Sequence, residues 1–138
     1  MKLSYNIDEA FELAGQIERN GAAFYRAAAD IVKSDPSRIF LLNLAEQEDE
    51  HVETFARMRA ELVLEDNSVA TYDVDETVAN YLKALAGQYI FNQSRQAKDI
   101  FSGNETMPEI LEMAISQEKD SIIYYLGIED AMIKDEDR

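Results

Sequence analysis

The only histidine in the sequence, His51, lies three residues after Glu48. Residues three apart on an α-helix share one face, so this carboxylate and this imidazole can reach a common point. An acid at that spacing is common in a chain in which 28 of 138 residues are acidic. The surrounding pattern makes the pair informative. Glu48 and His51 lie within a stripe of apolar residues spaced three and four apart, which is typical of a core-facing helix surface. The apolar positions are Leu41, Leu44, Val52, Phe55, Met58 and Leu62. We therefore predict that Glu48 and His51 point inward, where an unpaired ionised carboxylate would be strongly unfavourable.

Two further acids interrupt apolar stripes elsewhere in the chain. Glu18 interrupts a stripe near the N-terminus, and Glu118 interrupts one near the C-terminus. The first stripe consists of Phe11, Ala14, Ala22, Tyr25, Ala28 and Val32, and the second of Leu111, Ala114, Ile122, Tyr125 and Met132. The pattern predicts that both acids are inward carboxylates, like Glu48.

These residues are placed on three long predicted helices. The first runs from Asn6 to about Lys33, the second from about Pro36 to Glu65, and the last from about Thr106 to Lys134. The turn at 34–37 contains a proline, which suits the first turn of a helix. Helices joined so tightly should be antiparallel neighbours, so Glu18 and the Glu48–His51 pair should lie at similar depth.

The segment at about 66–105 reads as an irregular connection. Residues 66–75 are rich in turn formers and lack a helical period. Residues 76–101 favour a bent or broken helix, because Gly87 interrupts the apolar stripe formed by Val78, Leu82, Leu85 and Tyr89. We expect no inward carboxylate from this part of the chain.

Composition limits both the architecture and the chemistry. A uniform chain of 138 residues, 46% of them hydrophobic, with five glycines and two prolines, favours a single domain (1–138) of long helices. The net charge of −15 disfavours nucleic acid and anionic membrane as partners and attracts cations. Cysteine is absent, so a metal here must use oxygen and imidazole ligands. No apolar run reaches the length of a membrane span, which makes a soluble cytoplasmic protein the default expectation.

An internal repeat relates the two ends of the chain. A shift of one hundred positions places Glu18 on Glu118 and Tyr25 on Tyr125, and it also matches Glu9, Glu12, Ala14, Asp30 and Asp35 with identical residues. Shared helical periodicity can produce some of these matches. If the repeat is real, the counterparts of Glu48 and His51 would lie beyond Arg138, so these 138 residues hold only one of two Glu-x-x-His helices.

Three blocks of sequence resemble the rubrerythrin-like branch of the ferritin-like superfamily. They are Glu18 with Phe24-Tyr25, the run 47–51, and the run 118–122 followed by Tyr124-Tyr125. The resemblance implies an all-α, ferritin-like antiparallel helix bundle. In that bundle a Glu from each of two helices and a Glu-x-x-His from each of the other two hold two irons.

The resemblance also implies roles for individual residues. Glu18 and Glu118 would be terminal metal ligands, Glu48 would bridge the two metals, and His51 would bind one of them. The chain departs from the family in three respects. The second Glu-x-x-His helix is missing, the cysteine-bound iron of rubrerythrin cannot form, and Ser121 stands where rubrerythrin has an additional glutamate. Electrons would therefore have to come from another protein.

Three carboxylates and an imidazole suit iron(II) or manganese(II), with zinc as a substitute. We therefore predict a non-haem di-iron or di-manganese carboxylate protein that reduces peroxide or dioxygen, or oxidises iron(II). We expect no catalytic residues beyond the metal ligands. Tyr25 and Tyr125 are candidates for hydrogen bonds to the ligating carboxylates, although such tyrosines are as often core residues with one solvated hydroxyl.

The alternative is a non-catalytic helical dimerisation or interaction module that retains the ferritin-like fold. In that interpretation the three glutamates pair with Arg or Lys at a subunit interface, and His51 is a hydrogen-bonded core residue. A third interpretation has a half-site that a second copy of the chain completes. A homodimer or larger homo-oligomer is expected in either case, because long helices without a fourth partner leave apolar surface open.

Overall fold

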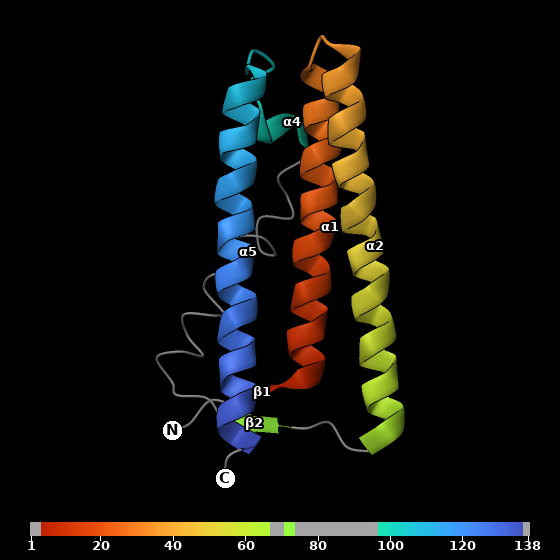
Figure 1. Ribbon diagram of the computed structural model, residues 1–138, viewed down its shortest axis with the longest axis vertical. Helices are drawn as coiled ribbons and strands as arrows, with labels where there is room; N and C mark the ends of the chain where they lie inside the picture. The colour runs from red at the N-terminus through yellow and green to blue at the C-terminus, as the bar shows by residue number, and fades with distance from the viewer. Residues whose placement is uncertain (1–3, 67–70, 74–96, 137–138) are drawn as a thin grey trace.

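The computed structural model describes residues 4–66, 71–73 and 97–136. Its elements are β1 (Ser4–Asn6), α1 (Ile7–Ile31), α2 (Asp35–Asp66), β2 (Thr71–Asp73), α4 (Ala97–Ile100) and α5 (Met107–Glu136). The three long helices lie side by side as a helical bundle, with the short α4 at one end and the strands at the other (Figure 1). The three predicted long helices are confirmed, with boundaries that differ by a few residues.

The turn between α1 and α2 forms where the proline predicts it. The Ser34 hydroxyl accepts a hydrogen bond from the Ser37 amide at 3.4 Å, which caps the start of α2. Arg38 reaches back and donates to the carbonyls of Ala29 (3.4 Å) and Val32 (3.2 Å). A helix end leaves its last carbonyls without intrahelical partners, so Arg38 satisfies acceptors that the turn would expose. The two helices are therefore antiparallel neighbours, as predicted.

A capping box starts α5. The Thr106 hydroxyl accepts from the Glu109 amide at 3.4 Å, and the Glu109 carboxylate accepts from the Thr106 amide at 3.2 Å. Pro108 occupies the first turn, where its missing amide hydrogen costs nothing. The helix runs antiparallel to α1 and in the same direction as α2 (Figure 1).

A short antiparallel ladder joins the start of α1 to the connection after α2. Tyr5 pairs with Tyr72, with Ser4 opposite Asp73 and Asn6 opposite Thr71. The loop predicted at 66–75 contains β2, so the prediction is wrong for Thr71–Asp73. The ladder joins residues far apart in the chain, so no local periodicity signals it. Most of the bent helix predicted at 76–101 lies outside the described residues, which resume at Ala97.

The core consists of two apolar clusters that follow α1. The larger contains Phe24, Leu41 and Ile110, together with Phe101, whose ring centroid lies 5.2 Å from that of Phe24. The smaller is built on Ile17 and Tyr124, both almost fully buried. The stripe predicted for the first helix is largely confirmed, because Ala14, Glu18, Ala22, Tyr25, Ala28 and Val32 are all buried.

The predicted faces of the other two helices need correction. On α2, the exposed fraction is 55% for the His51 side chain and 41% for Met58, although both were expected to face inward. On α5, Ile122 is 54% exposed, and Glu118 is also exposed. Among the described side chains of α5, the buried ones are Ala114, as predicted, and Ile110, Ser121 and Tyr124, which were not predicted. Leucine and isoleucine occur all around this helix, so their pattern did not identify the buried face.

None of the helices in the described residues combines the length and the apolar character needed to cross a membrane.

Candidate metal centre

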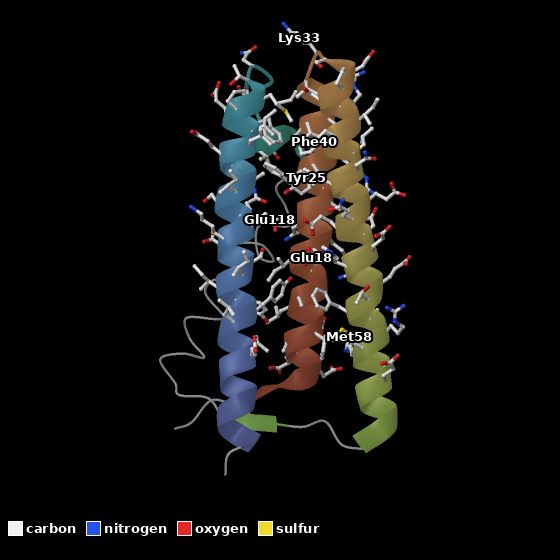
Figure 2. The ribbon with its side chains drawn as sticks, viewed as in Figure 1. Glu18, Tyr25, Lys33, Phe40, Met58 and Glu118 are labelled. Carbon is white, nitrogen blue, oxygen red and sulfur yellow. The ribbon has the colours of Figure 1, made fainter. Side chains whose placement is uncertain are left out.

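Three of the predicted ligands meet between α1 and α2. The Nδ1 atom of His51 lies 3.7 Å from Oε2 of Glu18 and 3.8 Å from Oε2 of Glu48. One donor atom from each residue falls within 4.8 Å of the other two. Figure 2 shows Glu18 and Glu118 at about mid-height in the bundle, on facing helices. The short turn at 34–37 brings Glu18 and Glu48 together, because it sets similar depths for both.

Glu48 is the most unusual member of this cluster. Its exposed fraction is 7%, and among the described residues its Oε2 is a buried oxygen without a hydrogen-bond partner. A buried carboxylate oxygen without a donor is strongly unfavourable unless a cation or a water satisfies it. This atom therefore indicates a ligand position more directly than the spacing of the motif does.

Gly21 makes room for the Glu48 carboxylate. A Cβ atom added at Gly21 would lie 3.2 Å from Cδ and 3.3 Å from Oε2 of Glu48. Sequence analysis did not identify this residue as part of the site. The sequence did contain a signal for it, because Gly21 lies three residues after Glu18 and therefore on the same helix face. Glycine is unfavourable inside a helix, so its presence there suggests a structural or functional role.

His51 occupies a different position from the predicted one. The ring was expected in the core, yet its side chain is more than half exposed while its Nδ1 faces the two carboxylates. Glu18, by contrast, is 9% exposed. The cluster is thus closed on the α1 side and reached by solvent along the His51 ring. This placement disagrees with the interpretation of His51 as a hydrogen-bonded core residue.

Two tyrosine–glutamate hydrogen bonds connect α1 with α5. The Tyr125 hydroxyl donates to Oε1 of Glu18 at 3.0 Å, and the Tyr25 hydroxyl donates to Oε1 of Glu118 at 2.9 Å. The two bonds are equivalent under the repeat, because adding one hundred to Glu18 and Tyr25 gives Glu118 and Tyr125. Both predicted tyrosines therefore contact predicted ligands, each on the opposite helix. Glu118 is not within the three-donor group.

The pKa values of Glu18 and Tyr25 are both raised in this site. Burial raises the pKa of Glu18; the charge of Glu118 raises it further, while the Tyr125 hydroxyl and His51 lower it. Burial also raises the pKa of Tyr25, and the negative charge of Glu118 adds to this. Among the described residues, no arginine or lysine forms an ion pair with Glu18, Glu48 or Glu118. In the described part of the chain, the ion-pair partner of Glu18 and Glu48 is His51 alone.

The two separations from His51 Nδ1 are short enough for ligands of one divalent ion. Metal–ligand distances for imidazole and carboxylate donors are about 2.0–2.2 Å, so two ligands of one ion are at most about 4.4 Å apart. The separations of 3.7 and 3.8 Å from Nδ1 lie within that limit. Oxygen and imidazole donors without thiolate suit iron(II) or manganese(II).

Comparison of the chain with protein-family models, with curated proteins and with solved structures gives no match in any of the three.

Proposed function

We propose that this protein is a non-haem metal-carboxylate protein that holds iron(II) or manganese(II) between α1 and α2. The observation that carries the proposal is the buried Oε2 of Glu48, which has no hydrogen-bond donor among the described residues and lies 3.8 Å from Nδ1 of His51. A cation at this point would satisfy that oxygen and draw on Glu18 as a third ligand. Zinc could substitute, but the carboxylate-rich donor set favours the harder ions.

The fold that we propose is the ferritin-like bundle, and the helix directions support it. Both α2 and α5 run antiparallel to α1 (Figure 1). In a ferritin-like fold, one long crossover connection joins two helices that run in the same direction, as α2 and α5 do. The sequence repeat that relates Glu18 and Tyr25 to Glu118 and Tyr125 also supports this fold, because a symmetric dinuclear site is expected to have such a repeat.

We propose a redox function for the site, whose residues would hold a pair of metal ions that, when bound, would supply electrons for the reduction of peroxide or dioxygen. The ligands would be Glu18, Glu48 and His51, with Glu118 on the α5 side serving a second ion. Tyr125 orients Glu18 and Tyr25 orients Glu118 through the hydrogen bonds described above. The chain has no cysteine for an electron-relay centre, so reduction would depend on an external electron-donor protein. Oxidation of iron(II) for storage is the close variant.

Anaerobic loading followed by oxidant distinguishes these activities. Iron(II)-loaded protein is mixed with hydrogen peroxide or with dioxygen, and the loss of bound iron(II) and of oxidant are both followed. The proposal expects faster oxidation than for free iron(II), with the enhancement absent in Glu48→Gln. Repeated peroxide consumption with a chemical reductant would identify a reductase, and accumulation of iron(III) would identify a ferroxidase. No enhancement over free iron(II) would contradict the redox function and favour the non-catalytic helical module.

We also propose that the chain forms a homodimer or larger homo-oligomer. Apolar side chains on one side of α5 support this, because Ile115, Ile122 and Leu126 are each more than half exposed. Their spacing of seven and four residues makes one continuous helical stripe. The second copy would be able to supply a further Glu-x-x-His pair. Sedimentation of the metal-free protein tests this, and a monomer at all concentrations would contradict it.

A further inference from the structure

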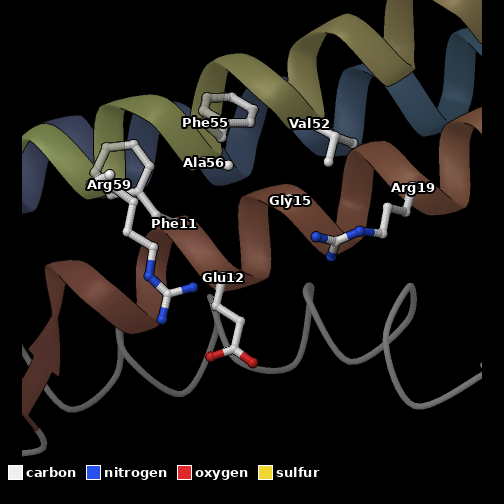
Figure 3. Close-up of a pocket in the computed structure, with 9 residues that line it drawn as sticks. Phe11, Glu12, Gly15, Arg19, Val52, Phe55, Ala56 and Arg59 are labelled. Carbon is white, nitrogen blue, oxygen red and sulfur yellow. The ribbon is translucent and has the colours of Figure 1, made fainter.

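A groove with an apolar floor runs along the α1–α2 pair. It has a volume of about 660 Å³, within the range of small-molecule sites. Phe11 and Gly15 line it from α1, and Val52 and Phe55 line it from α2 (Figure 3). Ala56 and Ala60 also line the groove and are exposed. Each has only a methyl group as its side chain, so the wall that α2 forms on this side of the groove is shallow. An apolar segment of a ligand would therefore meet two aromatic rings.

The groove has two arginines, which differ in their partners. Arg59 donates to both carboxylate oxygens of Asp8, at 2.5 and 2.8 Å, and its pKa is raised chiefly by this bond. Arg19 makes no hydrogen bond or ion pair with any residue in the described ranges. Its guanidinium extends along α1 toward Gly15, over the floor of the groove (Figure 3). In a chain of net charge −15, an arginine that has no acidic ion-pair partner among the described residues is unusual.

We propose that this groove binds a monocarboxylate with an apolar body, such as a medium-chain fatty acid. The guanidinium of Arg19 matches a carboxylate in geometry, because its N–H groups can donate to both oxygens. The apolar body then lies over Phe11 and Phe55. The single positive charge of Arg19 suits a ligand that carries one negative charge. A phosphate dianion would add charge beside Glu12, which also lines the groove.

The position of the Arg19 guanidinium sets the shortest apolar body that reaches the aromatic rings. The guanidinium lies beside Gly15, which is four residues from Phe11 on α1, or about 6 Å at 1.5 Å per residue. A linear chain such as octanoate, with its carboxylate on Arg19, is long enough to extend over Phe11. This inference goes beyond the proposed redox function and does not depend on it, since neither Arg19 nor Phe11 belongs to the metal cluster.

The test is calorimetric titration of the metal-free full chain with octanoate, in buffer without chelator. We expect saturable binding of one octanoate per chain, and much weaker binding of 1-octanol, which has the same apolar body without the charge. Arg19→Gln should weaken octanoate binding by about tenfold or more, because it removes a hydrogen bond between two charged groups. Arg19 is exposed, so this variant should fold normally.

A matched variant separates the groove from the overall charge. Arg57→Gln removes the same charge from an exposed position of α2 that does not line the groove, and should change binding by at most about twofold. In NMR spectra, octanoate should shift the methyl signals of Val52 in the groove and leave those of the buried Val32 unchanged. Absence of saturable binding, equal binding of octanol, or equal effects of the two arginine variants would each overturn the proposal. Unshifted Val52 signals would do the same.

Discussion

At the scale of single residues, the site depends on the space that Gly21 leaves for Glu48. A methyl group there would approach the Glu48 carboxylate to 3.2–3.3 Å, closer than most Cβ contacts. The carboxylate would have to move away from the point where it meets Glu18 and His51. The backbone gains from the same change, because alanine is more favourable than glycine in a helix by about 1 kcal/mol.

Gly21→Ala should therefore weaken metal binding by about tenfold or more, while the metal-free protein keeps or gains stability. Iron(II) titration and thermal unfolding of the metal-free chain measure the two effects. Gly15→Ala is the matched control in the same helix, since its added Cβ would lie 3.7 Å from the Arg19 side chain, an ordinary contact. Equal metal affinities for the two variants would show that the Glu48 carboxylate is not held where a ligand must be.

At the scale of elements, the two tyrosine–glutamate bonds fix α5 against α1, and they differ in how their acceptors are solvated. Glu18 is buried, with a side-chain exposure of 12%, whereas Glu118 is exposed. Water can replace the Tyr25 hydroxyl at Glu118 but has little access to Glu18. A hydrogen bond to a poorly solvated carboxylate therefore contributes more to folding.

Tyr125→Phe should lower the free energy of unfolding by about 1.5 kcal/mol, and Tyr25→Phe by less. Both changes keep the ring and its packing, so the difference reports the hydroxyl. Urea denaturation of the metal-free protein at neutral pH gives both values. A larger loss for Tyr25→Phe would be inconsistent with the burial of Glu18 described here.

The segment leading into α5 is ordered by another carboxylate. Glu105 accepts hydrogen bonds from the amides of Ser102 (2.7 Å) and Gly103 (3.0 Å), and from the Ser102 hydroxyl (2.9 Å). These bonds, led by that from the Ser102 amide, lower the pKa of Glu105 to about 2. Gly103 has φ of +101°, a conformation that favours glycine.

The lowered pKa of Glu105 has a defined consequence for stability. The contribution of this carboxylate is complete above its ordinary pKa of 4.5, and it is lost as the pH falls from there to about 2. An NMR titration of the Glu105 carboxyl carbon should give the low value, and Ser102→Ala should raise it by removing one donor. A wild-type value close to 4.5 would mean that the turn is not closed in solution.

Local sequence patterns predict these elements well where the determining contacts are near in sequence. The proline and serine of the turn at 34–37 and the Thr106–Glu109 capping box define helix starts that the structure contains. The face of α5 was not predictable in the same way, because Ile110 and Ile122 are chemically equivalent and only packing against α1 distinguishes them. The β1–β2 ladder depends on pairing between distant residues, which no local pattern encodes.

At the scale of the whole molecule, the bundle brings together Glu18 and Glu48, for which His51 is the ion-pair partner among the described residues. The sequence predicted that Glu18, Glu48 and His51 would meet, since the short turn fixes the depth of Glu18 relative to Glu48. It did not predict that His51 would remain accessible to solvent or that Glu118 would be exposed. Both outcomes depend on which surfaces neighbouring helices cover, and this follows from the packing of the complete bundle.

The central claim is that the Glu18–Glu48–His51 cluster binds a divalent metal. The most direct test is anaerobic titration of the metal-free protein with iron(II), compared with Glu48→Gln and Glu46→Gln. Glu46 is an exposed acid two residues earlier on α2, so its variant removes the same charge outside the cluster.

We predict saturable binding in the wild type and in Glu46→Gln, and its loss in Glu48→Gln. About two irons per chain would correspond to the full dinuclear site of a ferritin-like bundle, and about one per chain in a dimer to a site shared between copies. Absence of saturable binding in the wild type, or equal binding in the two variants, would contradict the claim.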